Sequence, residues 1–171
     1  MESTLLILLV VSSFFTFAQE TQIPVNEETQ LAEYAEVVDA AGTASDLYNA
    51  ALAWINEYYP NPNGTINSKV AGESIEGKSR FKVKLTDKKG RTIAQSYVNY
   101  SFKLEFNVHR YRYTIFKINW QQSSYFDVSR WEDTGHPRYE AETYPVYVQQ
   151  TVSLFDDYIA APKAGVAKPP T

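Results

Sequence analysis

The hydrophobic positions first follow a helical spacing, between residues 43 and 58. Thr43 suits the N-cap, and Asp46 lies three residues further on, near the positive end of the helix dipole. A continuous apolar stripe follows, made of Leu47, Ala51, Trp54, Ile55 and Tyr58. Pro60 and the turn sequence PNPNG end the segment. The pattern predicts an amphipathic helix with Trp54 in the core.

The period then changes to two, which is typical of strands with one buried face. Alternating segments occupy residues 78–86, 95–108 and 110–120, and DKKG at 87–90 is a turn sequence. Weaker strand patterns precede them at residues 31–40 and 68–76. A short turn at residues 107–109 joins the last two segments and predicts a hairpin. The order indicates one strand, one helix and then a meander of antiparallel strands.

Alternation assigns the strand residues to two faces of the predicted sheet. The face expected to pack under the helices carries Phe81, Val83, Leu85, Val98, Tyr100, Phe102, Leu104 and Phe106. The opposite face carries Arg80, Lys82, Lys84, Tyr97, Asn99, Ser101, Lys103 and Glu105. In the segment RYRYTIFKINW, residues 110–120, alternation puts the even-numbered residues on one face and the odd-numbered residues on the other. Neither of those two faces is purely apolar.

The remaining segments differ in character from these strands. Residues 121–145 are polar with scattered aromatic side chains, and they predict a long ordered loop. A second helical stripe follows, made of Tyr147, Val148, Thr151, Leu154, Phe155, Tyr158 and Ile159. Residues 19–30 predict a flexible lead-in and residues 161–171 a disordered tail. We therefore expect a single domain over residues 31–160.

The N-terminal segment has the pattern of a secretory signal peptide over residues 1–18. Leu5 to Ala18 is an uninterrupted run of apolar and small hydroxyl residues, too short to span a bilayer as a helix. Thr16 and Ala18 form a small-residue cleavage site, although Glu2 stands where a positive charge is usual. The alternative is a buried N-terminal segment. The signal peptide predicts an exported chain that begins at Gln19, in the periplasm or at the cell surface, with no membrane span after cleavage.

Four segments carry a resemblance to a known family: DLYNAALAWINEYY, IEGKSRF, VNYSFKLEF and RYRYTIFKINW. They resemble an uncharacterised family of exported bacterial domains described as having a TBP-like fold, the fold of the TATA-box-binding protein. The resemblance covers about residues 31–120, and the closing helix extends it. It implies an α+β fold of the β-α-β4-α type, an antiparallel sheet with two helices packed on one face. It implies no catalytic residues, and the fold alone does not imply DNA binding.

Composition narrows the classes of function. The net charge of -4 opposes a nucleic-acid partner, since such proteins present a basic surface. The absence of cysteine excludes disulfides, thiolate metal sites, a cysteine nucleophile and a lipoprotein anchor. His109 and His136 lie on separate predicted elements, so we expect no metal and no cofactor.

Two groups of residues remain as candidates for function. One is a binding face on the open side of the sheet, made of Arg80, Lys82, Lys84, Tyr97, Asn99, Lys103 and Arg112. The alternative is an ordinary solvated face on which Glu105 pairs with an arginine across the hairpin. The other group is an acid and histidine cluster in the loop, made of Arg130, Glu132, Asp133, His136 and Glu140. It suggests a hydrolase, whereas a solvated loop held down by Trp131 is the simpler interpretation.

The sequence therefore predicts an exported, non-catalytic binding or scaffolding module. The partner expected is an anionic or glycan-like ligand, or another envelope protein. The hydrolase is the second hypothesis, and no complete catalytic constellation supports it.

Overall fold

The computed structural model describes residues 23–121, 125–137 and 139–166. The predicted signal peptide at residues 1–18 and the mature start at Gln19 lie outside the described residues.

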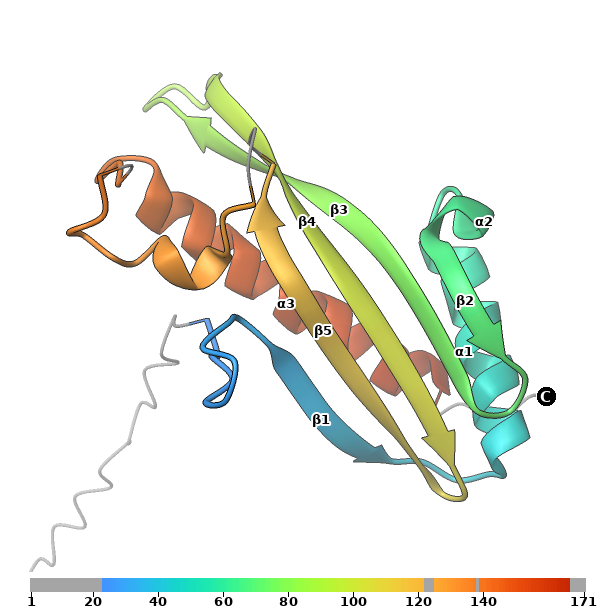
Figure 1. Ribbon diagram of the computed structural model, residues 1–171. Coiled ribbons are helices and arrows are strands. Elements are labelled where there is room, and N and C mark those ends of the chain that lie inside the picture. The colour runs from blue at the N-terminus through green and yellow to red at the C-terminus, as the bar shows by residue number, and fades with distance from the viewer. Residues whose placement is uncertain (1–22, 122–124, 138, 167–171) are drawn as a thin grey trace, which may run out of the picture.

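The described chain folds into one antiparallel sheet covered by helices on one face (Figure 1). The strands are β1 (Tyr34–Asp39), β2 (Ile66–Val70), β3 (Ser74–Thr86), β4 (Thr92–Asn107) and β5 (Arg110–Trp120), in the sheet order β1-β5-β4-β3-β2. The helices are α1 (Ala44–Tyr58), the short α2 (Pro62–Thr65) and α3 (Tyr144–Val166), with a 3-10 turn, η1 (Val128–Arg130), in the long loop. α1 packs against β4, β5 and α3, and α3 packs against β3. The predicted α+β architecture is confirmed.

Helix α1 begins and packs as its sequence predicts, with one exception at its end. The Thr43 hydroxyl accepts a hydrogen bond from the Asp46 N–H at 3.2 Å, and the Asp46 carboxylate accepts one from the Thr43 N–H at 2.9 Å. Trp54 is buried, whereas Tyr58 is 46% exposed and stacks on the Trp54 ring. Tyr59, the next residue, takes the buried position instead. The expectation that Tyr58 belongs to the buried stripe is wrong, because the helix ends there and the chain turns inward one residue later.

The core between the sheet and the helices is rich in aromatic rings. Tyr59 stacks on Phe102 of β4, and Tyr100 packs edge-to-face with Phe155 of α3. The Tyr59 hydroxyl donates a hydrogen bond to the Tyr158 hydroxyl at 3.0 Å and lies 3.2 Å from the Tyr100 hydroxyl. Since a phenol carries one proton, Tyr100 is the donor in the second bond.

Strand β5 contains a β-bulge that simple alternation does not predict. Asn99 pairs with Asn119 and Ser101 pairs with Phe116, so Tyr100 of β4 faces two residues of β5. One of these is Lys117, whose φ of 53° lies in the left-handed region. Beyond the bulge the faces exchange. The predicted placement of the even-numbered residues on one face is therefore wrong after Phe116.

The exchange brings the apolar residues of β5 onto one side. Ile118 is fully buried, like Tyr111, Tyr113 and Ile115 before the bulge. Trp120 contacts the Tyr147 ring of α3. These residues therefore all face the core.

The two ends of the domain are more ordered than the sequence suggests. Ile23 is 4% exposed, Val25 pairs with Ala32, and the Asn26 side chain accepts hydrogen bonds from the N–H groups of the following turn. The described part of residues 19–30 thus includes a buried side chain and a hydrogen-bonded turn. Helix α3 extends to Val166, into the segment 161–171 that was expected to be disordered. Residues 167–171 lie outside the described residues.

The predicted strand at residues 68–76 is not continuous either. It is divided by a turn at residues 71–73 into the end of β2 and the start of β3, and the Glu73 N–H donates to the Val70 carbonyl at 3.0 Å.

Candidate functional site: the open face of the sheet

The sheet face opposite α1 and α3 is uncovered, and we call it the open face. The ladder between β3 and β4 aligns Arg80 with Asn99, Lys82 with Tyr97 and Lys84 with Gln95 on this face. Their alternating neighbours Val83, Val98 and Tyr100 are buried on the other face. The structure thus places all seven predicted binding residues on the open face: Arg80, Lys82, Lys84, Tyr97, Asn99, Lys103 and Arg112.

One half of the open face is basic, and we call it the basic half. Its cations are Lys78, Arg80, Lys82, Lys84 and Lys117. The Arg80 guanidinium carbon lies 4.5 Å from the centre of the Tyr97 ring, and the Lys82 ammonium lies 5.4 Å from it. Among the described residues none of the five cations forms an ion pair with a carboxylate. Their charge is therefore available to a ligand.

The other half of the open face is mixed in charge, and we call it the mixed half. Lys103 forms an ion pair with Glu105 at 2.7 Å, and this contact raises the pKa of Lys103. Glu76 lies opposite Lys103, and Arg112 lies opposite Glu105 in the ladder. Lys103 and Arg112 are therefore not part of the same basic surface as Arg80. The predicted face divides into two regions of different charge.

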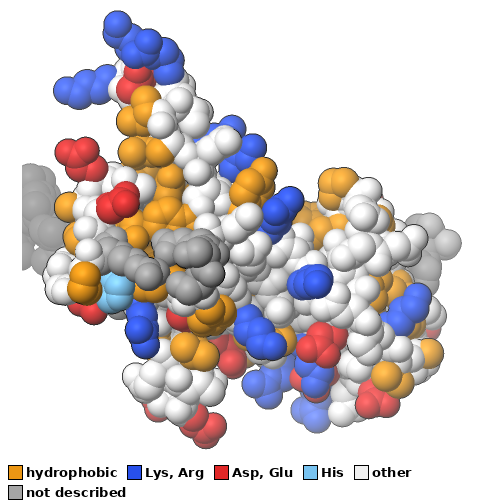
Figure 2. All heavy atoms as spheres, turned by 45° about the horizontal axis from the view of Figure 1, so that its top comes forward, with side chains coloured by type: hydrophobic (Ala, Val, Ile, Leu, Met, Phe, Trp, Pro, Cys, Tyr) orange, Lys and Arg blue, Asp and Glu red, His pale blue; other side chains and the backbone are white. Residues whose placement is uncertain are grey.

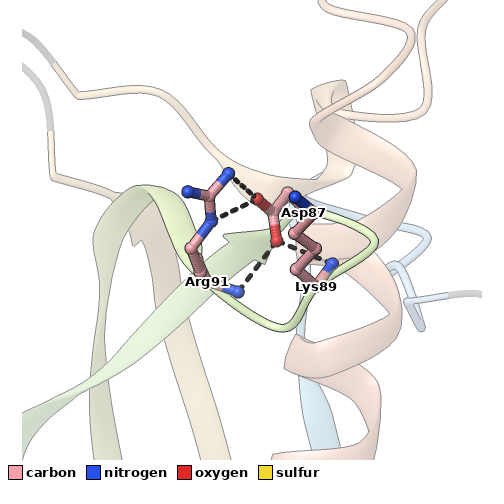
Figure 3. Close-up of polar contacts among 3 residues, drawn as sticks. All are labelled: Asp87, Lys89 and Arg91. Atoms are coloured by element: carbon pink, nitrogen blue, oxygen red, sulfur yellow. Dashed lines mark hydrogen bonds and ion pairs between the residues drawn. The ribbon is translucent and has the colours of Figure 1, made fainter.

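The turn between β3 and β4 carries three further cations, Lys88, Lys89 and Arg91. Asp87 uses both carboxylate oxygens within this turn (Figure 3). One oxygen accepts from the N–H groups of Lys89 and Arg91 at 2.8 and 2.9 Å, and the other pairs with the Arg91 guanidinium at 2.7 Å. These bonds lower the pKa of Asp87. Arg91 is thus neutralised, whereas no carboxylate among the described residues pairs with Lys88 or Lys89.

Figure 2 shows Lys and Arg side chains at the tip of this hairpin and further ones along the sheet below it. The turn therefore adds cations at one end of the basic half.

A groove of about 970 Å³ adjoins the basic half at the exposed side of β3. One wall is the segment that carries Tyr59, Pro60, Asn61 and Thr65. The rest of the lining comes from the open face, including Lys78, Arg80, Asn99, Lys117, Asn119 and Tyr125. The groove combines cations with amides and phenols.

The tyrosine hydroxyls at the inner end of the groove are unsuited to act as bases. Tyr59 and Tyr100 line the groove and share their hydroxyl contact at 3.2 Å. Burial raises the pKa of both phenols. They therefore stay protonated at neutral pH and serve as hydrogen-bonding groups.

The side chains of the predicted acid and histidine cluster in the loop make contacts with different groups. Glu132 lines a groove of about 420 Å³ with Trp131 and Tyr139, and burial raises its pKa. The Asp133 carboxylate accepts from the Gly135 N–H at 3.0 Å, and the His136 ring packs on Phe126. The Arg130 and Glu140 carbonyls accept backbone hydrogen bonds of the loop. Trp131, 1% exposed, anchors the loop that carries these side chains.

Within the described ranges, no group of three or more histidine, aspartate or glutamate side chains could hold a metal ion. No helix in the described part of the chain is long and apolar enough to cross a membrane.

The sequence did not single out four residues of the basic half and its groove: Lys78, Lys117, Asn119 and Tyr125. Lys78 lies two positions before Arg80, so the strand alternation places both on the same face, and the sequence could have identified it. Lys117 and Asn119 join the open face only because of the bulge. A signal for that exists, since the apolar residues fall at the odd positions 111, 113 and 115 and then at the even positions 116, 118 and 120. Tyr125 comes from the loop after β5, and no local pattern places it there.

Comparison with known proteins agrees with this architecture. Residues 34–121 match the family described as "Domain of unknown function (DUF4468) with TBP-like fold". The chain belongs to this family. The match spans β1 to the end of β5, and so it contains most of the basic half. No curated protein matches the chain.

Two solved structures have a similar fold. A TBP-like protein from Parabacteroides distasonis has a TM-score of 0.68 and 14% identity, over 86% of this chain and 99% of that one. A DUF4468 family protein from Bacteroides ovatus has a TM-score of 0.67 and 14% identity, over 87% of this chain and 92% of that one. At this identity the likeness shows the TBP-like fold alone.

Proposed function

We propose that this DUF4468 domain is an exported, non-catalytic binding module whose ligand is anionic and is held on the basic half of the open face. The observation that carries the proposal is the arrangement of Arg80 and Lys82 around Tyr97, beside the groove at the exposed side of β3. Cations held in place before binding lose little side-chain entropy when a ligand arrives.

The contacts of Tyr97 favour an anionic ligand over a neutral sugar. A neutral sugar would stack on an aromatic plate, but the Tyr97 ring already has Arg80 at 4.5 Å and Lys82 at 5.4 Å. A sugar on this ring would have to displace a cation. An anion instead meets both cations without moving them, and Asn99 and Asn119 add amide donors in the same groove.

The charge of the basic half is the reverse of the charge of the whole chain. The protein carries a net charge of -4, yet the basic half has five cations without ion-pair partners among the described residues. A local positive field on an acidic protein attracts anions to one place and repels them elsewhere. This concentration of charge also distinguishes the basic half from the mixed half.

Export rests on the apolar run from Leu5 to Ala18 and its small-residue cleavage site. An exported domain would meet its ligand outside the cytoplasm.

Binding to defined polymers tests the proposal. We expect the chain to bind polyglutamate or polygalacturonate, with affinity that falls as salt is added, and not to bind neutral dextran. The variant Lys82→Gln/Lys84→Gln should lose most of this binding.

A matched control on the same sheet face is the variant Lys103→Gln/Arg112→Gln, which removes the same charge from the mixed half. Equal loss in the two double variants would contradict a site on the basic half. Absence of binding to every polyanion would contradict the proposal itself.

A further inference from the structure

We infer that the anionic ligand is an extended acidic polypeptide, which adds as a new strand to the free edge of β3. This inference rests on the proposed function, because it identifies the ligand class of the same basic half. It adds a mode of recognition in which backbone hydrogen bonds supply affinity and the cations supply selectivity.

The edge of β3 beyond β2 has unused backbone groups. β2 ends its pairing with β3 at Ile66 and Gly77, so the following residues of β3 have β4 on one side only. In an antiparallel ladder, alternate residues turn their N–H and C=O groups toward opposite neighbours. The question is which residues turn outward.

Two contacts show in which direction the backbone N–H and C=O groups of β3 point. The Tyr97 carbonyl accepts from the Gln121 N–H at 2.8 Å, so Tyr97 turns its backbone toward β5 and away from its partner Lys82. Lys84 bonds outward through both its N–H and its C=O. Lys82 and Arg80 have the same parity as Lys84. Their N–H and C=O groups therefore lie in the plane of the sheet and point away from β4, beyond the edge of β3. Within the described part of the chain these groups have no hydrogen-bond partner.

Gln150 of α3 shows how this edge accepts a partner. Its side-chain amide accepts from the Lys84 N–H at 2.9 Å and donates to the Lys84 C=O at 2.7 Å. These are the two bonds that one residue of an antiparallel neighbouring strand would make. At Lys84 the Gln150 side chain therefore bonds the backbone N–H and C=O groups as a strand would. At Arg80 and Lys82 the same backbone groups remain available to a new strand.

The surroundings of the edge select the side chains of the partner. Residues of an added strand opposite Arg80 and Lys82 point to the open face, where these cations favour glutamate or aspartate. The intervening residues point to the other side, into a pocket of about 240 Å³ whose lining includes Tyr58, Phe81 and Leu154. Tyr58 is 46% and Leu154 is 37% exposed. An alternation of acidic and apolar residues fits both sides.

A second copy of this strand is disfavoured as the partner. Pairing β3 with itself would bring two rows of Lys and Arg together, and lysines on an edge strand oppose such self-association. The same charges favour an acidic strand from another protein.

Hydrogen exchange with a defined probe tests the inference. The probe is a short capped peptide in which glutamate alternates with valine. When it binds to the full chain, we expect the backbone amides of Arg80 and Lys82 to exchange more slowly. The Phe81 amide, which already faces β4, should stay unchanged. N-methylation of the peptide on its pairing side should weaken binding about tenfold, as the loss of backbone bonds predicts.

A variant of α3 adds an independent readout. Gln150→Ala frees the N–H and C=O of Lys84, so the open edge becomes longer and we expect the peptide to bind about fivefold more tightly. Gln149→Ala removes an exposed neighbouring amide and should leave affinity unchanged.

The outcomes separate this inference from the proposed function. Salt-sensitive peptide binding without protection of Arg80 and Lys82, and without an effect of N-methylation, would overturn edge pairing and leave the anion site standing. Tighter binding of polygalacturonate than of the peptide would also overturn it, in favour of an acidic glycan. If neither probe binds, both the inference and the proposed function are wrong.

Discussion

The guanidinium carbon of Arg80 lies 4.5 Å from the centre of the Tyr97 ring on the neighbouring strand. Lys82, directly opposite Tyr97 in the ladder, approaches the same ring at 5.4 Å. The ring therefore holds two cations in defined positions on the surface of the sheet. The two positive charges of Arg80 and Lys82 repel each other in these positions. An anion bound between or above them reduces that repulsion.

Replacement of the Tyr97 ring tests this organising role. Tyr97→Phe keeps the aromatic face, so polyanion binding should stay within about twofold of the wild type. Tyr97→Ala removes two exposed cation–π contacts, each contributing about 0.5–1 kcal/mol, and should weaken binding about fivefold to tenfold. Isothermal titration with polyglutamate measures both. An equal loss in the two variants would show that the hydroxyl, and not the ring, is what matters.

Truncation of Trp54 tests the core under α1. Trp54 is buried and contacts the rings of Tyr59 and Tyr158. Trp54→Ala should lower the free energy of unfolding by about 3–5 kcal/mol, as for other large-to-small changes in a core. Urea denaturation followed by circular dichroism measures the loss. A loss below about 1 kcal/mol would place Trp54 at the surface and contradict the packing described above.

The hydroxyl cluster offers a matched pair of conservative changes. Tyr59→Phe leaves the hydroxyls of Tyr100 and Tyr158 without the group they share, and should cost about 1–3 kcal/mol of stability. Tyr111→Phe is the control, because the Tyr111 hydroxyl is buried without a hydrogen-bond partner among the described residues. That change should be neutral or stabilising. Equal unfolding midpoints for the two variants would show that the cluster does not contribute to stability.

Acid should weaken the contact between β1 and the C-terminal helix. The Glu36 carboxylate accepts hydrogen bonds from Lys163 at 2.8 Å and from Tyr113 at 2.9 Å, and these bonds lower the pKa of Glu36. Because the folded pKa of Glu36 lies below the unfolded one, the stabilisation is complete only above the unfolded pKa, at about pH 5 and higher, and is lost as the pH falls through the folded pKa.

Thermal melts between neutral and acid pH measure this effect. Glu36→Gln should flatten the fall in melting temperature below about pH 5 and leave the rest of the profile in place. Identical profiles for the wild type and Glu36→Gln would contradict a role for this contact.

Local rules were sufficient for much of the fold. The Thr43 and Asp46 capping pair, the apolar stripe of α1 and the alternation of β4 each depend on residues close in sequence, and each element forms where they indicate. The side of the sheet that carries Arg80, Lys82, Lys84 and Tyr97 follows from the same alternation.

What the sequence could not supply depends on contacts between distant segments. The bulge at Lys117 needs the register of β4 against β5, and it moves Lys117 and Asn119 onto the open face. The division of the face depends on Glu76 and Glu105, which meet Lys103 and Arg112 only across the ladder. The open edge at Arg80 depends on where β2 stops, and its closure at Lys84 depends on Gln150, which lies 66 positions away in the chain.

The most direct test of the central claim is a residue-resolved NMR titration of the chain with oligoglutamate at low salt. The account predicts that the largest chemical-shift changes fall on the basic half, at Arg80, Lys82, Tyr97, Asn99 and Asn119, and that added salt reverses them. Changes centred on Lys103 and Arg112, or on the loop around Glu132 and His136, would contradict a ligand site on the basic half.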